Sequence, residues 1–340
     1  MTKKPNLSYN TILLLLAVCL LLAIIGSVTL GRYPIGLKEL GGILLSRIRP
    51  VEPFWTKTQE SLLLQHRLPR ILLACLVGGC LSSAGAAYQG VFQNPMAAPD
   101  ILGASSGAAF GAALAILLRL SGSWIMVLAF LGSIVTVLLV MFVAGRAKGK
   151  RVLGLILAGI MVSSLISSGT SLIKLVADPE DQLPAITYWL MGGLNNAAFK
   201  TLLLGAPPII LGIVILYLLR WRMNLLPLSE DEVRSSGVNI SVLRGITVVC
   251  APMITASCVS MCGQVGWVGL LIPHMCRMKF GSNHLSLLPA SISFGAAFLM
   301  IVDTVARSAS AQEIPISILT AIIGAPFFII LMRKSGGWSL

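Results

Sequence analysis

Long apolar runs separated by short polar connections are the feature that most constrains this chain. A helix that crosses a bilayer needs about 20 predominantly apolar residues, and ten stretches approach or reach this length. One of them, 266–280, is short and contains Pro273, so we expect a tilted, broken or partly re-entrant segment there. The ten stretches cover residues 11–31, 62–84, 102–120, 124–145, 152–175, 199–220, 242–262, 266–280, 287–308 and 315–333. They predict an all-α polytopic membrane protein with about ten transmembrane helices.

The composition leaves room for one membrane domain and little else. Of the 340 residues, 56% are apolar and 11% are charged, whereas soluble domains carry about 25% charged residues. Ten spans take about 200 residues, which leaves about 140 (340 − 200) for connections. A soluble catalytic domain of ordinary size does not fit, and we expect residues 1–340 to form a single transmembrane domain.

The positive charge of the chain indicates its orientation in the membrane. The 25 Lys and Arg exceed the 12 Asp and Glu, giving a net charge of +13, but no basic stretch is interleaved with aromatic residues as a nucleic-acid site would require. With the N-terminus inside and ten spans, 14 cations and four acids lie inside, a net of +10, against +3 outside (11 − 8). Because cytoplasmic loops collect Lys and Arg, both termini are predicted to be cytoplasmic. The first apolar run, behind Lys3 and Lys4, is interpreted as a retained helix rather than a cleaved signal.

The patterns that soluble catalysis or metal binding would need do not occur in the sequence. The three histidines are far apart, the seven cysteines form no CxxC pair, and Gly149-Lys150 lacks the rest of a phosphate-binding loop. We therefore expect no enzymatic activity, no metal site and no cofactor in this chain. The energy for any transport would come from a partner or from an ion gradient.

Five motifs lie in a distinctive order along the chain. They are Arg67-Leu-Pro-Arg70, Gln93-Asn-Pro-Met-Ala-Ala-Pro-Asp-Ile-Leu-Gly103, Gly269-Leu-Leu-Ile-Pro-His-Met-Cys-Arg277, Leu288-Pro-Ala-Ser291 and Ile314-Pro-Ile-Ser-Ile-Leu-Thr-Ala-Ile-Ile-Gly-Ala-Pro-Phe-Phe328. From about residue 11 to 334, the chain resembles the FecCD/BtuC-like permeases, which are the membrane subunits of ABC importers for iron chelates, haem and cobalamin.

The resemblance implies a fold, a location and a set of partners. The fold would be the BtuC-like (type II) ABC importer permease fold, with ten spans per subunit, in the cytoplasmic membrane of a bacterium or archaeon. The partners would be a second permease, two cytoplasmic ATPase subunits and an external binding protein that is periplasmic or lipid-anchored. The two permeases would form a homodimer, with a close heterodimer as the alternative. The substrate most consistent with the resemblance is an iron(III) chelate such as an iron(III)-siderophore. Cobalamin and haem follow, and an oxyanion such as molybdate is more remote.

Three arginines are expected at the outer face, against the inside bias of positive charge. Arg67 and Arg70 start the second span and Arg307 ends the ninth. One interpretation is contact with lipid headgroups. The resemblance implies another, in which the three arginines dock acidic residues of the external binding protein. Asp303 precedes Arg307 by four residues, so an intrahelical salt bridge is also expected, and it is compatible with docking.

The longest inside connection, 223–241, is the predicted site of energy coupling. Ser229 followed by acids is a good helix start, and the leucines and valine of this segment would be uncovered apolar groups that indicate a partner surface. A solvated cytoplasmic helix is the alternative. The resemblance places coupling helices at 224–241, and the residues expected to act in coupling are Glu230, Asp231, Glu232, Arg234 and Gly237.

The fifth span is unusually rich in hydroxyl groups for a membrane helix. Small hydroxyl residues often serve only to pack helices together, and the alternative is a pathway lining that offers weak hydrogen bonds. A gate at the inner mouth is predicted from the turn after the second span and from the basic loop after the fourth. The residues assigned to pathway and gate are Ser164, Ser167, Ser168, Ser171, Asn94, Met96 and Lys148.

An ion-coupled secondary transporter is the alternative from another functional class. Such a protein needs buried charged residues near the middle of the membrane. Only Asp303 and Lys174 come near, and both lie toward the outer ends of their spans.

Overall fold

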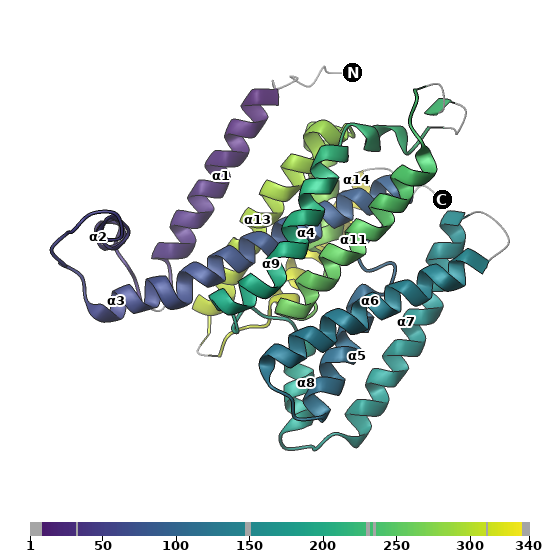
Figure 1. The fold of residues 1–340 in the computed structure, drawn as a ribbon. Coiled ribbons are helices and arrows are strands. Elements are labelled where there is room, and N and C mark those ends of the chain that lie inside the picture. The colour runs from purple at the N-terminus through teal and green to yellow at the C-terminus, as the bar shows by residue number, and fades with distance from the viewer. Residues whose placement is uncertain are drawn as a thin grey trace.

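The computed structural model describes residues 9–31, 33–146, 151–228, 232–233, 236–310 and 312–334, and every regular element among them is a helix (Figure 1). All ten predicted spans coincide with helices. The second, predicted at 62–84, continues to Val91, and the other nine agree to within about three residues at each end. Four short elements, α2, α3, α8 and η2, lie in the connections. The helices are α1 (Tyr9–Thr29), α2 (Leu37–Ser46), α3 (Lys57–Ser61), η1 (Leu62–Arg67), α4 (Leu68–Val91), α5 (Ala104–Leu117), α6 (Gly122–Arg146), α7 (Arg151–Val176), α8 (Gln182–Leu190), α9 (Phe199–Leu219), η2 (Arg222–Leu225), α11 (Ile240–Cys262), α12 (Val268–Phe280), α13 (His284–Ser308) and α14 (Ile316–Lys334).

Helix length separates full spans from shorter segments. Among the described residues, six helical stretches are long and apolar enough to cross a membrane, and shorter apolar stretches occur in α1, α5 and α14. The longest runs without a break from Lys57 to Val91, 35 residues, or about 50 Å at 1.5 Å per residue. It is therefore longer than the ~30 Å hydrocarbon core. By contrast α12 has 13 residues, as expected for a short segment.

The core of the molecule is built around α4, which packs against α13, α11 and α12. Its buried face consists largely of small residues, and these allow backbones to approach closely without a hydrophobic driving force. A Cβ atom on Gly78 would lie 2.2 Å from the carbonyl oxygen of Gly295 in α13. One on Gly85 would lie 1.8 Å from that of Gly269 in α12. No larger residue fits at either crossing.

Two sides of the molecule can be distinguished from the contacts between helix ends. On the first, which we call the arginine side, Arg70 at the start of α4 meets Asp303 near the end of α13. On the second, the coupling side, Gln93 after α4 donates to the carbonyl oxygen of Leu226 after η2. In Figure 1, α2 and α3 lie at the left end of the long α4, whereas the connection from η2 to α11 lies at the upper right.

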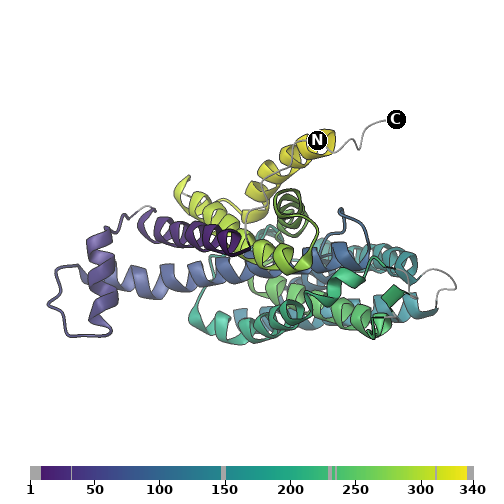
Figure 2. The ribbon, with the colours of Figure 1, turned by 90° about the horizontal axis from the view of Figure 1, so that it is seen from above.

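Several helices are poorly covered by the rest of the chain. In α7, only 17% of the most apolar window is buried, and in α9 only 22%. Figure 2 shows α14, in yellow, standing away from the other helices. Large apolar side chains such as Leu165, Leu172 and Ile322 are more than 60% exposed on these helices. A single chain therefore leaves apolar faces that only lipid or another subunit can cover.

Candidate functional site

The three predicted arginines come together on the arginine side, and Arg70 is at the centre of the cluster. Its Nε donates to Asp303 Oδ1 at 2.9 Å and its Nη2 donates to the same oxygen at 2.8 Å. Its Nη1 donates to Glu313 at 3.0 Å. Two acids from the far end of the chain thus hold one guanidinium in a fork, which is the geometry that arginine favours.

Arg67 and Arg307 are tied to the end of α1. Arg67 donates to the backbone carbonyls of Val28 and Tyr33. Arg307 donates to the carbonyl of Ser27 and, at 3.3 Å, to its hydroxyl. The expected i,i+4 ion pair is confirmed, with Arg307 Nε 3.7 Å from Asp303 Oδ2. Sequence reasoning missed that Asp303 also holds Arg70 and that Glu313 belongs to the cluster.

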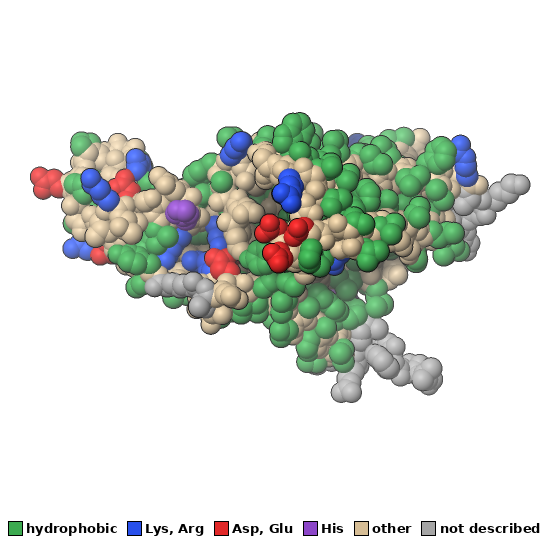
Figure 3. Space-filling view, turned by 90° about the horizontal axis from the view of Figure 1, so that it is seen from below, with side chains coloured by type: hydrophobic (Ala, Val, Ile, Leu, Met, Phe, Trp, Pro, Cys, Tyr) green, Lys and Arg blue, Asp and Glu red, His purple; other side chains and the backbone are tan. Residues whose placement is uncertain are grey.

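A cavity of about 320 Å³ opens beside this cluster. Arg67 is only 6% exposed and lines this cavity. Figure 3 shows basic, acidic and histidine side chains gathered at the surface next to the projecting part of the chain. The docking role of the three arginines stays a prediction, and the cavity beside them is one that a side chain can enter. The polar residues that line this cavity are Arg67, Arg70, Arg307, Asp303, Glu313, His66, Tyr33 and Asn195.

The coupling segment is described only in part. Glu230, Asp231 and Arg234 lie outside the described residues. Glu232 is exposed, and Gly237 has a φ of +70°, a left-handed turn that suits glycine. Their coupling role stays a prediction.

The expectation that the apolar residues of this segment form an uncovered partner surface is wrong for two of them. Leu226 and Val233 are fully buried, because the segment folds back onto the chain. Leu225 is half-buried, and only Leu228, at 40% exposure, stays accessible. Leu226 and Val233 therefore hold the segment against the rest of the chain and do not form a surface for a partner.

Side-chain amides tie the coupling segment to α13, a link that the sequence did not reveal. Asn224 in η2 accepts from the backbone N–H of His284 at 2.8 Å and donates to Asn283 Oδ1 at 2.9 Å. His284 Nδ1 lies 3.1 Å from the same Asn224 oxygen. One asparagine therefore clamps the first turn of α13. The only signal in the sequence was the pair of amide residues, which could not be matched without the fold.

The four predicted pathway serines share one exposed face of α7. Ser164, Ser167, Ser168 and Ser171 are spaced i, i+3, i+4 and i+7, which places them on one side of a helix. Ser168 and Ser171 donate to carbonyls one turn earlier, at 3.0 and 3.1 Å. None of the four is covered by its own chain, so they do not pack helices within it.

The predicted gate is described in part. Asn94 Oδ1 accepts from the backbone N–H of Met96 at 2.9 Å and so closes a short turn on the coupling side. Both residues are exposed. Lys148 lies outside the described residues.

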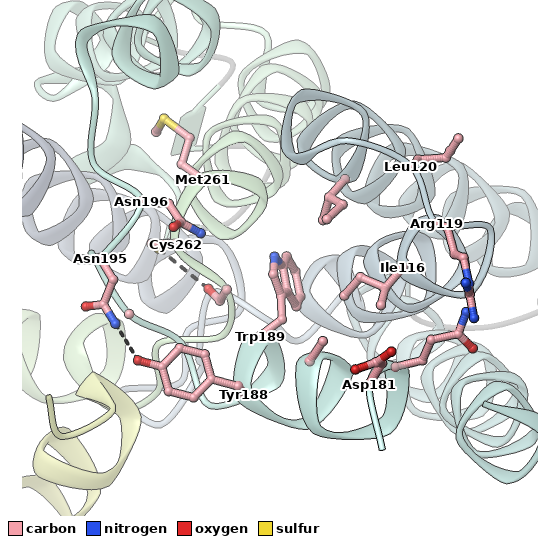
Figure 4. Close-up of a pocket in the computed structure, with 15 residues that line it drawn as sticks. Ile116, Arg119, Leu120, Asp181, Tyr188, Trp189, Asn195, Asn196, Met261 and Cys262 are labelled. Carbon is pink, nitrogen blue, oxygen red and sulfur yellow. Dashed lines mark hydrogen bonds between the residues drawn. The ribbon is translucent and has the colours of Figure 1, made fainter. Parts of the chain in front are cut away.

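A second cavity, of about 520 Å³, lies beside α8 and was not anticipated (Figure 4). Trp189 of α8 and Met261 of α11 line it, together with Arg119, which has a left-handed φ of +56°. Asn195 borders both cavities and donates to the Tyr188 hydroxyl of α8. This bond joins α8 to a residue that lines the cavity beside the arginine cluster.

The start of α8 is fixed by a carboxylate in the turn after α7. Asp178 Oδ1 accepts backbone N–H groups from Asp181 at 3.1 Å and from Glu180 at 2.9 Å. These hydrogen bonds favour the charged form and lower the pKa of Asp178.

Among the described residues, no group of three His, Cys, Asp or Glu could hold a metal ion.

Known proteins share both the sequence and the fold. The model of the FecCD transport family matches residues 18–334. The chain is 40% identical over 327 residues to the molybdate import system permease protein MolB of Haemophilus influenzae, covering 96% of each. It is 41% identical over 276 residues to the permease protein assigned to an iron chelatin transport system of Helicobacter pylori, covering 81% of this chain and 83% of the relative. A solved inward-facing structure of an ABC transporter described as metal-chelate type has a TM-score of 0.86 and 39% identity, covering 96% of this chain and 99% of that one.

Proposed function

Because the chain belongs to the FecCD transport family, we propose that two copies of it form the pathway of a binding-protein-dependent importer for an iron(III) chelate. The chain is the transmembrane permease subunit of an ABC importer, which is a non-catalytic component. Membership of this family excludes the alternative function, that of an ion-coupled secondary transporter. The proposal concerns the substrate, the second copy and the arrangement of partners.

The hydroxyl face of α7 is the observation that carries the pathway between two copies, and the choice of an iron(III) chelate rests on the relative from an iron chelatin transport system. Ser164, Ser167, Ser168 and Ser171 are exposed on a helix of which little is buried within the chain. Contact with lipid is unfavourable for the hydroxyls of Ser164 and Ser167, because hydrocarbon offers them no partner. Ser168 and Ser171 already donate to carbonyls of their own helix. A water-filled pathway between two copies would accept this face. Neutral hydroxyls would let a bulky solute pass without the deep binding well that a charged site creates.

The partners follow from the two sides of the molecule. An ABC importer permease works with ATPase subunits and a binding protein. We place two ATPase subunits against the coupling segment at 224–241, and the external binding protein at the arginine side. Both termini would then be cytoplasmic, in agreement with the excess of Lys and Arg. The membrane would be the cytoplasmic membrane of a bacterium or archaeon.

Vesicles reconstituted with the complete complex test this function. We expect uptake of an iron(III)-siderophore only when ATP, both ATPase subunits and the loaded binding protein are present. The permease alone should hydrolyse no ATP. Uptake driven by a proton or sodium gradient without the ATPase would overturn the proposal.

Molybdate is the second candidate, because the 40% identical relative that matches 96% of this chain is a molybdate permease. The two substrates can be separated in the same vesicles by offering each with its own loaded binding protein. Uptake of molybdate without uptake of any iron(III) chelate would replace the first candidate. Haem and cobalamin, the other substrates that the resemblance to this family implies, are tested in the same vesicles.

A further inference from the structure

Arg70 makes two ion pairs of different character. The Asp303 side chain is 1% exposed, whereas the Glu313 side chain is 32% exposed. Breaking a buried pair leaves an uncompensated charge away from water and is strongly unfavourable. Breaking the pair with Glu313 costs less, because this side chain is partly exposed and lines the cavity, although its Oε2 atom is itself buried. Asp303 is therefore a fixed partner of Arg70, and Glu313 is a replaceable one.

The cluster has an excess of positive charge. Three guanidinium groups, of Arg67, Arg70 and Arg307, face two carboxylates, which leaves a net charge of +1 (3 − 2). The cavity of about 320 Å³ beside them is open to an incoming side chain. A further carboxylate would be attracted there, and it would compete with Glu313 for the Nη1 of Arg70.

Glu313 also lies next to the parts of the chain that border the cavities. Three residues later, the backbone N–H of Ile316 at the start of α14 donates to the carbonyl of Gly192 at 3.1 Å. The Ser317 hydroxyl donates to the carbonyl of Met191, just after α8. Movement of the backbone at Glu313 would thus reach the junction where α8 ends and α14 begins through Ile314, whose N–H donates to the carbonyl of Ala306 in α13 at 3.2 Å.

We propose that Glu313 is an internal substitute for the docking carboxylate: an acidic side chain of the external binding protein displaces Glu313 from Arg70, and the released segment frees the junction of α8 and α14. This proposal rests on the docking role in the proposed function. It adds that docking is a replacement of one carboxylate by another. It gives Arg70 a resting partner until the binding protein arrives.

The test uses the full complex in nanodiscs and measures both association of the binding protein and ATP hydrolysis. In Glu313→Gln the competing charge is removed, so we expect association about three-fold faster. We also expect ATP hydrolysis without binding protein to rise toward the docked rate. The matched control is Glu52→Gln, which removes one exposed acid from the connection between α2 and α3. A merely general charge effect would accelerate association equally in both variants and would refute the proposal.

A second variant separates docking from replacement. Arg307→Gln should slow association if the arginine cluster docks the binding protein at all. If Arg307→Gln slows association while Glu313→Gln behaves as wild type or binds more weakly, docking stands and the substitution of carboxylates is refuted. If neither variant nor added salt changes association, the docking role itself is wrong. Should Glu313→Gln fail to assemble, Glu313→Asp, which keeps the charge on a shorter side chain, must show an intermediate acceleration.

Discussion

Replacing Asn224 with alanine is predicted to uncouple ATP hydrolysis from transport. The side chain accepts from the His284 backbone N–H at 2.8 Å and donates to Asn283 at 2.9 Å. His284 is 5% exposed, so its N–H would lose its partner in a place that water scarcely reaches. An orphaned buried donor costs about 1–3 kcal/mol, and the bond to Asn283 adds about 1 kcal/mol. We expect the link between the coupling segment and α13 to weaken by about 2–4 kcal/mol in total.

The assay is the ratio of ATP hydrolysed to substrate taken up in vesicles containing the full complex. A link weakened by this amount lets the coupling segment move without α13, so ATP hydrolysis should persist while uptake falls by at least ten-fold, since ~1.4 kcal/mol corresponds to a factor of ten. Asn224→Asp keeps the acceptor for His284 and should retain more uptake than alanine.

Asn239→Ala is the matched control for stability. Asn239 caps α11 on the same side, with its Oδ1 accepting from the Val242 N–H at 3.1 Å, and loss of such a cap costs about 1 kcal/mol. It loosens a helix end without cutting the link to α13. Wild-type stoichiometry in Asn224→Ala, or an equal loss of uptake in Asn239→Ala, would refute the idea that Asn224 carries the coupling.

Three further outcomes are expected. Gly85→Val should prevent accumulation of folded protein, measured by detergent-stable gel filtration, because even a Cβ would lie 1.8 Å from the Gly269 carbonyl; Gly41→Val, at a position with open space, is the control. Ser167→Leu should lower uptake while leaving ATP hydrolysis intact, whereas Ser167→Ala should have little effect, because a pathway wall depends on its width and wetting more than on one hydroxyl. Raising ionic strength should slow association of the binding protein with the wild-type complex, since screening weakens attraction between exposed charges; an unchanged rate would argue against charge-guided docking.

The helices could be predicted from the sequence because a membrane span depends on the length and hydropathy of one continuous stretch of residues. Length and hydropathy alone located α6 and α7 to within a few residues, and the short run around Pro273 corresponds to the 13-residue α12, which continues through the proline without a break. The same holds for the hydroxyl face of α7, since its spacing of three and four residues fixes one helix face.

Pairings between distant segments could not be predicted in this way. Arg70 and Asp303 are separated by 233 positions, and the sequence around either residue does not identify its partner. For the same reason Leu226 and Val233 were wrongly expected to face a partner subunit. Their surroundings are set by how the connection folds back onto α4 and α13, and that is a property of the tertiary structure.

Three of the contacts between α4 and α13 explain how events on the two sides can be linked. Arg70 pairs with Asp303 at the arginine side, Gly78 meets Gly295 in the middle, and Gly90 lies against His284 at the coupling side, where a Cβ would be 3.0 Å from the ring. Advancing eight and then twelve residues along α4 retreats eight and then eleven along α13, so the helices run antiparallel in close contact over their length. Packed interiors of this kind do not deform continuously. Movement must therefore occur at segments attached to the ends of the pair, where Glu313 is held on one side and Asn224 on the other.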